Sequence, residues 1–437
     1  HSGSKKPLLL DSKYLSLDPE GVLEELCNSC QIPFQKEMLR WEAGPRPFDI
    51  PNAKFWYENV WKSTGFLPYR AEEPETFTGD LAGVATELES LYKKLETHKN
   101  AVKRKPKPVY VGIGKDVHDI LPDGRNANLK VWVSDLGGIV DRENARVSVF
   151  DSSVQGGDHV WEGIRVYEGK IFALQYHIDR LMDSAKALNY AGIPSQEEIE
   201  HAIIETLKAN GMRDGVHMRL TLTRGTKVSS SMNPLFNRSG CTLIVLAEWK
   251  DPVYSDEGIR LITSSIRRNT PAILDSKIHH GNMLHLILAK MQANFAQVDD
   301  AVMLDVDGFV AETNACNIFA VVRPVGYPSK RVLVTPLPDA CLNGVTRQIV
   351  LELARAADSF LDLDVQERRV SLTELHAATE VFVTGSMGAL TSVVEIDGRR
   401  IGTQSPNISL SERFPITAYL QDAYFDRWQN TGHILPF

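Results

Sequence analysis

Three side chains in this sequence are of types that could hold and transform a small molecule: Lys277, Glu312 and Arg165. The amine of a lysine can bond covalently to a carbonyl carbon, and it can carry protons when burial or neighbouring cations lower its pKa. A glutamate can stabilise a protonated ring nitrogen, and an arginine can bind a phosphate through charge-assisted hydrogen bonds. Because a lysine taken alone is usually a solvated surface charge, its surroundings in the sequence must decide its role.

Each of these residues lies in a distinctive local pattern, and two further patterns accompany them. Those two combine glycine with a hydroxyl residue. The same combination also caps ordinary helices, so each of these patterns alone is weak evidence for a binding site. Their joint occurrence is more specific than any one of them. In chain order the patterns are Trp161-Glu162-Gly163-Ile164-Arg165, Asp275-Ser276-Lys277, Asp307–Phe319 around Glu312, Gly344-Val345-Thr346-Arg347, and Thr384-Gly385-Ser386-Met387.

Together the patterns resemble those of the fold-type IV pyridoxal-phosphate enzymes, from about Asn128 to about Gly402. That class holds branched-chain aminotransferases, D-amino-acid aminotransferases and aminodeoxychorismate lyases. The resemblance implies pyridoxal 5′-phosphate as cofactor and amino-group transfer between an amino acid and a 2-oxo acid, through an aldimine of Lys277. It also implies a homodimer.

The resemblance assigns a role to each site residue. Lys277 is the expected catalytic residue, Glu312 is expected at the ring nitrogen of the cofactor, and Arg165 is expected at its phosphate. The backbone N–H groups that open the helix at Gly344 are expected to meet the same phosphate. The further cofactor-binding residues are Asn317, Val345, Thr346, Ser386 and Met387.

The substrate is less well defined by the sequence. Arg219 matches an arginine near the pocket of branched-chain enzymes, and we expect it to bind substrate. The Arg-x-His of D-amino-acid aminotransferases is missing after Thr223–Thr226, although a D-amino acid stays open as a substrate. Arg224 is equally readable as a helper at the pocket or as a turn residue. The run Ile278–Met283 departs from the glycine pair and Asn-Tyr of branched-chain enzymes, so we expect a different pocket.

Two alternatives to a transaminase remain at this point. A lyase of the aminodeoxychorismate type would share the cofactor site and release pyruvate without an added 2-oxo acid. A non-catalytic protein would keep the fold as a scaffold, although the lysine, glutamate and arginine argue against this. Histidines 279, 280 and 285 lack an acid or cysteine partner in the sequence, so we expect no metal site.

The first 97 residues differ in character from the rest. They resemble the C-terminal end of a sulfotransferase-like domain, in Ser16–Cys27, Ile32–Phe34 and Met38–Trp41, and plant-type branched-chain-aminotransferase-like proteins join such a domain to a fold-type IV domain. No G-x-x-x-x-G-K-[ST] phosphate loop is present, so we interpret residues 1–97 as a helical remnant. The basic, proline-containing stretch 98–108 is expected to be a linker.

Strands followed by helices and again by strands predict an α+β class, with a small α/β domain at 109–250. The family resemblance implies that residues 251–437 form a larger pseudo-barrel domain. The alternation of apolar residues predicts the strands, and the helical spacing predicts the helices. The expected strands are 8–11, 130–133, 139–140, 146–150, 216–223, 242–246, 260–263, 301–304, 318–322, 332–334 and 381–383. The expected helices are 18–30, 81–95, 175–191, 196–209, 282–296 and 345–357.

Composition narrows the class of partner. The net charge of −8 argues against nucleic acid, and the sequence has no apolar run of about 20 residues for a membrane span. Cys27 and Cys30 form a lone C-x-x-C, which we interpret as two neighbours on one helix face. The start His1–Ser4 reads as a non-native remnant, so the compartment is left open.

Overall fold

The chain divides into two compact units, residues 1–122 and 123–437. The structure is a computed structural model that describes residues 15, 19–30, 32–39, 123–327, 329–357, 361–402 and 408–437. In the first unit, helix α2 (Pro19–Cys30) and the 3-10 helix η1 (Lys36–Leu39) are described, and α2 confirms the helix expected there. Cys27 is buried and Cys30 is exposed, both as free thiols. The strand expected at 8–11, the helix at 81–95 and the linker lie outside the described residues.

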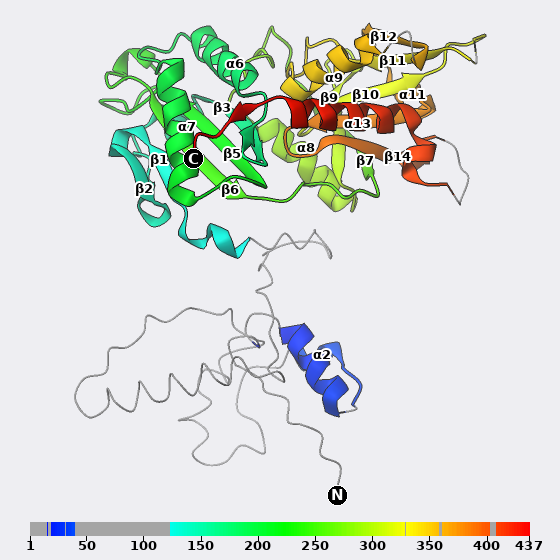
Figure 1. The fold of residues 1–437 in the computed structure, drawn as a ribbon, viewed down its shortest axis with the longest axis horizontal. Coiled ribbons are helices and arrows are strands. Elements are labelled where there is room, and N and C mark those ends of the chain that lie inside the picture. Colours follow the sequence, from blue (N-terminus) through cyan, green and yellow to red (C-terminus); the bar gives the residue numbers. More distant parts are fainter. Residues whose placement is uncertain are drawn as a thin grey trace, which may run out of the picture. The chain divides into compact units, whose positions relative to one another are not determined.

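One lobe of the second unit is built on a seven-stranded sheet, counted within the described residues (Figure 1). Its strand order is β16-β4-β3-β5-β6-β1-β2, and every pairing is antiparallel. The strands are β1 (Lys130–Val133), β2 (Gly138–Asp141), β3 (His159–Tyr167), β4 (Lys170–Ile171), β5 (Val216–Thr223), β6 (Thr242–Trp249) and β16 (His433–Ile434).

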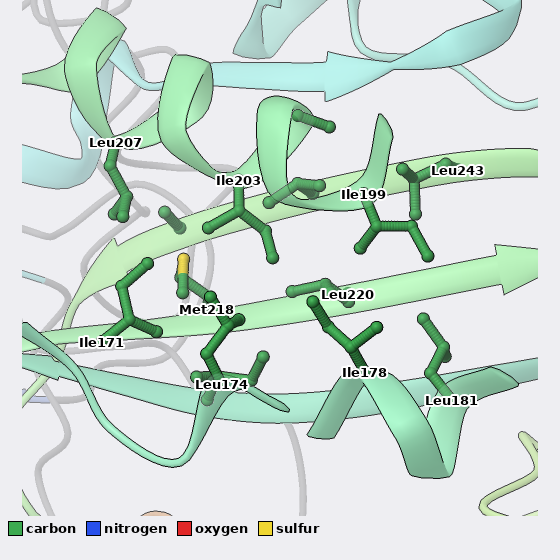
Figure 2. Close-up of a cluster of buried hydrophobic side chains, with 14 of the residues drawn as sticks. Ile171, Leu174, Ile178, Leu181, Ile199, Ile203, Leu207, Met218, Leu220 and Leu243 are labelled. Carbon is green, nitrogen blue, oxygen red and sulfur yellow. The ribbon is translucent and has the colours of Figure 1, made fainter. Parts of the chain in front are cut away.

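Two helices, α6 (Leu174–Ala187) and α7 (Gln196–Asn210), pack on this sheet. Helix α7 begins at a capping box formed by Ser195 and Glu198, and it ends at Gly211 in the left-handed conformation. The apolar faces of both helices meet Met218 and Leu220 of β5 in one cluster (Figure 2). Each fully buried leucine or isoleucine there stabilises the fold by about 1.5–3 kcal/mol.

The other lobe is built on a nine-stranded mixed sheet, again counted within the described residues. Its order is β12-β11-β10-β13-β14-β7-β8-β9, with β15 paired to β14, and it curls into a partial barrel. The strands are β7 (Ile259–Arg267), β8 (Asp300–Leu304), β9 (Val310–Thr313), β10 (Asn317–Val322), β11 (Arg331–Thr335), β12 (Leu363–Glu367), β13 (Glu380–Gly385), β14 (Ala389–Ile396) and β15 (Arg399–Arg400).

Helices α9 (Val345–Ala356) and α13 (Pro415–Asn430) lie beside this sheet (Figure 1) and share an apolar cluster with Phe319 of β10 and Phe382 of β13. The two rings stack with centroids 5.0 Å apart. Helix α8 (Leu284–Phe295) packs against β7 and β8 in a separate cluster. The bounds of two further helices are α11 (Leu372–Ala377) and α12 (Leu410–Arg413). The remaining short helices are α5 (Ser152–Gly156), η2 (Gly124–Asn128), η3 (Ser134–Leu136), η4 (Arg142–Asn144) and η5 (Pro234–Phe236).

The α+β class and the two-lobed arrangement are confirmed, and most expected elements are present. The strand expected at 146–150 is wrong: its residues form a loop and turn, with Val149 and Phe150 exposed, because no neighbouring strand pairs with them. The boundary expected at residue 250 falls between β6 and β7, which belong to different sheets. As a division into domains it stays a prediction, since β16 returns to the first sheet from the end of the described chain.

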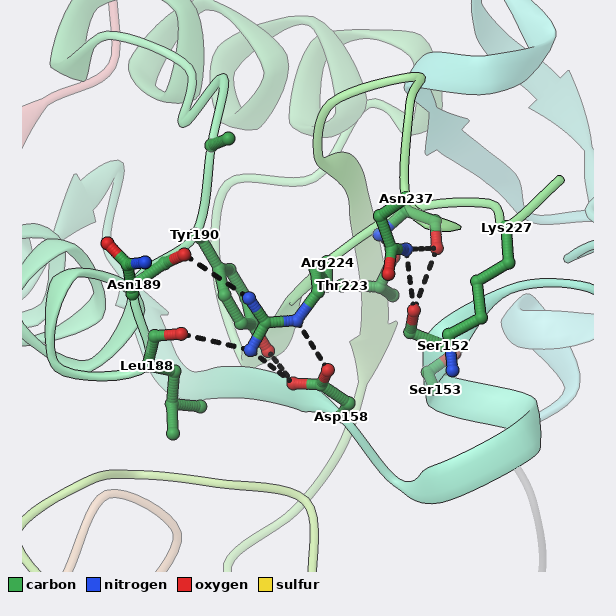
Figure 3. A network of polar contacts seen from close by, with 12 residues as sticks. Ser152, Ser153, Asp158, Leu188, Asn189, Tyr190, Thr223, Arg224, Lys227 and Asn237 are labelled. Carbon is green, nitrogen blue, oxygen red and sulfur yellow. Dashed lines mark hydrogen bonds and ion pairs between the residues drawn. The ribbon is translucent and has the colours of Figure 1, made fainter. Parts of the chain in front are cut away.

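The turn after β5 settles the role of Arg224 (Figure 3). Its guanidinium pairs with Asp158 at 2.5 Å and donates to the carbonyl oxygens of Leu188 and Asn189. The next residue, Gly225, has φ +94°, and a Cβ there would lie 1.8 Å from the carbonyl oxygen of Gly240. Arg224 is therefore a structural residue of this turn, not a pocket residue.

None of the helices in the described part of the chain is long and apolar enough to cross a membrane.

Candidate active site

A cavity of about 280 Å³ collects most of the residues expected at the site. Strands β3 and β5 of the first lobe form one wall, and β9, β10, the start of α9 and the end of β13 form the other. The expected residues that line it are Arg219, Glu312, Asn317, Val345, Thr346, Ser386 and Met387.

Glu312 on β9 marks one end of the cavity. It is 6% exposed, and its Oε1 lies 2.7 Å from Nη2 of Arg268. Its Oε2 accepts hydrogen bonds from Asn317 Nδ2 at 3.1 Å and from the N–H of Leu342 at 3.4 Å. Burial raises the pKa of Glu312, and the Arg268 guanidinium opposes that rise. The ion pair keeps a carboxylate in place here, where it can bind a protonated ring nitrogen.

The start of helix α9 forms a second part of the cavity lining. Its N-cap, Gly344, supplies no side-chain cap, so the first-turn N–H groups of Val345 and Thr346 have no partner within the helix. Glycine is required at this position because a Cβ would lie 2.1 Å from Oδ1 of Asn317. Since unpaired N–H groups and the helix dipole both favour negative charge, this end can bind an anion.

Arg165 on β3 reinforces the anion end. It is 4% exposed and lines a small adjoining cavity together with Val345, Thr346 and Ser386. Its Nε donates to the Tyr167 hydroxyl at 3.0 Å and its Nη1 to the carbonyl oxygen of Lys250 at 2.7 Å. No carboxylate among the described residues pairs with it, which leaves Nη2 for a bound anion.

Arg219 on β5 also lines the cavity, as does Arg180. Its guanidinium lies 4.0 Å from the centroid of the Trp161 ring, and it has no acidic partner among the described residues. Burial lowers the pKa of Arg219. The neighbouring His217 has its pKa lowered to about 3 by burial and by the charges of Lys250 and Arg165, so it is neutral near pH 7. An anionic group in the cavity would therefore meet Arg219 unopposed by any acid of that wall.

Lys277 is the expected site residue that lines neither this cavity nor the small adjoining cavity of Arg165. Its side chain is 47% exposed, and its Nζ lies 3.9 Å from Oδ1 of Asp275. It lines a neighbouring cavity of about 450 Å³ that shares Arg180, Gly344 and Val345 with the site. Among the described residues, no lysine lines the site cavity itself. The covalent role of Lys277 therefore stays a prediction.

His279, two residues further on, does line the cavity. Its Nδ1 lies 3.2 Å from Oε1 of Glu162, a carboxylate with no exposed surface. Arg180 donates to both oxygens of that carboxylate, at 2.8 and 2.7 Å, and His177 Nδ1 lies 2.6 Å from Oε2. Arg180 and the histidines hold the pKa of Glu162 well below its usual range, although burial alone would raise it.

The sequence interpretation missed this cluster because it sought a metal ligand for His279 among nearby residues. The partner, Glu162, lies 117 residues earlier in the chain. A signal was present, since Glu162 lies between the apolar residues Trp161 and Ile164, and a buried acid there needs a partner.

Comparison with known proteins places this geometry in a family. Residues 159–396 match the family described as amino-transferase class IV, and residues 4–95 match a sulfotransferase domain. The chain is 49% identical over 434 residues to branched-chain-amino-acid aminotransferase-like protein 2 of Arabidopsis thaliana, which covers 98% of this chain and 72% of that protein. It is 38% identical over 277 residues to a putative branched-chain-amino-acid aminotransferase of Methanocaldococcus jannaschii. That match covers 63% of this chain and 91% of that protein.

Solved structures agree. The branched-chain aminotransferase of Thermoproteus uzoniensis with norvaline has a TM-score of 0.58 at 29% identity, covering 68% of this chain and 94% of that one. The T.th. branched-chain amino acid aminotransferase complexed with N-(5′-phosphopyridoxyl)-L-glutamate has a TM-score of 0.60 at 32% identity. The match covers 69% of this chain and 95% of that one.

The two lobes and the cavity between their sheets therefore define a pyridoxal-phosphate-dependent enzyme of fold type IV. The family is equally clear from the match along residues 159–396: the chain belongs to the class IV aminotransferases.

The residues of this chain fit the cofactor at both ends. Arg165, Ser386 and the start of α9 form an anion site, and the Glu312 carboxylate lines the same region. Two further residues that line the cavity have buried polar atoms, Thr384 Oγ1 and Trp161 Nε1, with no hydrogen-bond partner among the described residues. Buried polar atoms are rarely left unpaired, so both are available to a polar ligand.

Proposed function

We propose that this chain transfers an amino group between an amino acid of the branched-chain type and a 2-oxo acid, with pyridoxal phosphate in the site cavity. The observation that carries the proposal is the presence of two opposite charges at the cavity and the small cavity that adjoins it. The Glu312 carboxylate is held by Arg268, and a buried guanidinium without an acidic partner among the described residues, Arg165, lines the adjoining cavity together with the start of α9.

When bound, the cofactor supplies a ring that withdraws electrons from the substrate, provided its nitrogen stays protonated. Glu312 favours that proton by a charge-assisted hydrogen bond, and Arg268 favours the ionised form of Glu312, against the effect of burial. The anion end fixes the phosphate, and so orients the ring. Arg219 binds the substrate carboxylate from the wall opposite Glu312 and α9.

The cavity also supports an apolar substrate side chain. Val253, Leu342 and Met387 line it beside the rings of Trp161 and Tyr254. Apolar walls with a few placed polar groups are typical of small-molecule sites. The names of the relatives, branched-chain-amino-acid aminotransferases, agree with such a substrate.

Lys277 could supply the covalent bond to the cofactor only after a conformational change. Its backbone N–H donates to Asp275 Oδ1 at 2.9 Å, and the N–H of Ile278 donates to the Asp275 carbonyl oxygen at 3.2 Å. This turn directs the amine into the neighbouring cavity. The turn has to open before the amine can enter the site.

The test of the proposed function is a half-reaction followed by absorbance. Purified protein with pyridoxal phosphate is mixed separately with L-leucine, D-alanine and L-glutamate, without a 2-oxo acid. We expect the cofactor band to change with L-leucine and the matching 2-oxo acid to appear in equal amount. Release of pyruvate without an added 2-oxo acid, from a substrate other than alanine, would instead indicate a lyase. A band that none of the three amino acids changes would contradict the proposal.

We also propose a homodimer in which helix α8 contributes to the interface. Five large apolar side chains of α8 are between 45% and 75% exposed: Leu284, Ile287, Leu288, Met291 and Phe295. A cluster of this kind is unusual on a monomer and typical of a protein contact. We expect the double change Ile287→Glu and Leu288→Glu to convert the dimer to a monomer, measured by light scattering. The matched control Val325→Glu, at a fully exposed residue of a turn, should stay dimeric.

A further inference from the structure

We infer that this chain binds its cofactor without a covalent bond, and that the imidazole of His279 is the proton acceptor of the site. The inference rests on the proposed function, since it takes the site cavity as the cofactor site. It departs from the role expected for Lys277.

The first argument is the direction of the Lys277 segment. The Asp275 turn holds Lys277 outside the cavity, and the following side chain, Ile278, packs against the hydrophobic core of the first lobe. Bringing the amine into the cavity would break the turn and withdraw Ile278 from that core. Because Ile278 would lose apolar contacts that stabilise the first lobe, the movement opposes the fold.

The second argument is the way His279 is fixed. Its carbonyl oxygen accepts the N–H of Trp161 at 3.0 Å, and its own N–H donates to Ser184 Oγ at 3.1 Å. Its ring lies against the Trp161 ring, with centroids 4.1 Å apart. Backbone and ring are therefore both held, and a side chain held in this way is preorganised for a bound molecule.

The third argument is the tautomer. Nδ1 of His279 faces two groups: the ionised Glu162, whose Oε1 accepts at 3.2 Å, and Arg180, whose Nη2 can only donate and lies further away, at 3.5 Å. The shorter contact with the acceptor assigns the hydrogen to Nδ1. Nε2 then keeps its lone pair, and it has no hydrogen-bond partner among the described residues. Burial lowers the pKa of His279 to about 4, against the opposing charge of Glu162, so the ring is neutral near pH 7. A neutral imidazole oriented by a buried carboxylate is an arrangement suited to accepting a proton.

With the substrate amine joined to the aldehyde carbon of the bound cofactor by loss of water, Nε2 of His279 would accept the proton released from the substrate α-carbon, and the cofactor would supply the ring that takes up the electron pair of that C–H bond. The resulting imidazolium would return the same proton to the adjacent carbon of the cofactor. No oxidant or reductant is consumed, and the charge on His279 is restored.

The first experiment asks whether a covalent bond exists. The holoprotein is treated with borohydride, which fixes a cofactor bound to lysine, and the polypeptide mass and peptides are then measured. We expect bound cofactor but no stoichiometric mass increase in the wild type or in Lys277→Ala, with equal affinities. His279→Lys puts an amine in the cavity, and we expect that variant to gain one cofactor per chain at residue 279.

Stoichiometric labelling of Lys277 in the wild type would overturn the inference and leave the proposed function standing. A wild type that binds no cofactor at all would overturn the proposed function, and this inference with it. The two failures are therefore distinguishable.

The second experiment tests the role of His279. We expect His279→Gln to keep cofactor affinity and to slow the amino-acid half-reaction by about 100-fold or more. The matched control is His280→Gln, because His280 is the next residue and is buried, but it does not line the cavity. Equal half-reaction rates in His279→Gln and the wild type would overturn the assignment.

Discussion

Replacing Glu312 by glutamine is expected to leave the cofactor bound and to reduce turnover by about 100- to 1,000-fold. Glutamine keeps the shape and can still accept a hydrogen bond from Asn317, but it carries no charge to hold a proton on the ring nitrogen. The measurements are cofactor affinity and kcat on the same preparations. Turnover within about threefold of the wild type would contradict the role of Glu312.

Loss of stability is the competing explanation, because Glu312→Gln also leaves the buried Arg268 without its anion. Glu380→Gln is the matched control. Glu380 is also buried with a raised pKa, and it accepts hydrogen bonds from the N–H groups of Ile416 and Thr417, away from the cavity. We expect this control to lower the thermal midpoint without a comparable loss of turnover.

Replacing Arg165 by glutamine is expected to weaken pyridoxal phosphate binding by roughly 30- to 150-fold. A charge-assisted hydrogen bond of this kind contributes about 2–3 kcal/mol, and about 1.4 kcal/mol is tenfold in affinity. The Nη2 atom of Arg165 is the donor without a partner among the described residues, so its loss acts on the ligand directly.

The control for Arg165→Gln is the ligand rather than a second variant. Pyridoxal without its phosphate should bind the wild type and the variant with similar affinity, because the removed contact is to the phosphate. Inorganic phosphate should compete with the cofactor more weakly in the variant than in the wild type. If the substitution weakened the binding of pyridoxal and of pyridoxal phosphate equally, the anion site would have been placed wrongly.

The sequence predicted the fold where a local pattern is strong. The apolar alternation of residues 216–223 and the capped helix at 196–210 are formed as expected, because their local preference agrees with their packing. Strand β3 was not predicted, since most of its residues are buried and it lacks the alternation of a half-buried strand. The run 146–150 alternates, yet no partner strand lies beside it in the described part of the chain.

The positions of the site residues were likewise predicted where a local pattern is strong and not elsewhere. Glu312, Arg219 and the start of α9 lie in the cavity as expected, because each belongs to a regular element whose position fixes it. The segment from Asp275 to Asn282 is irregular, and its direction depends on contacts with β3 and α6 far away in the sequence. A two-residue difference in such a segment, between Lys277 and His279, decides which side chain enters the cavity, and no local pattern encodes it.

The pairing of β16 with β4 has a consequence for the order in which the chain folds. Lys170 at the start of β4 donates to the carbonyl oxygen of Gln429, 259 residues later, and the buried Leu435 completes the core of the first lobe. During synthesis the early strands of this lobe leave the ribosome long before the segment that covers their edge. Contacts so distant in sequence form slowly, so the nascent lobe keeps an open strand edge until translation has passed the second lobe.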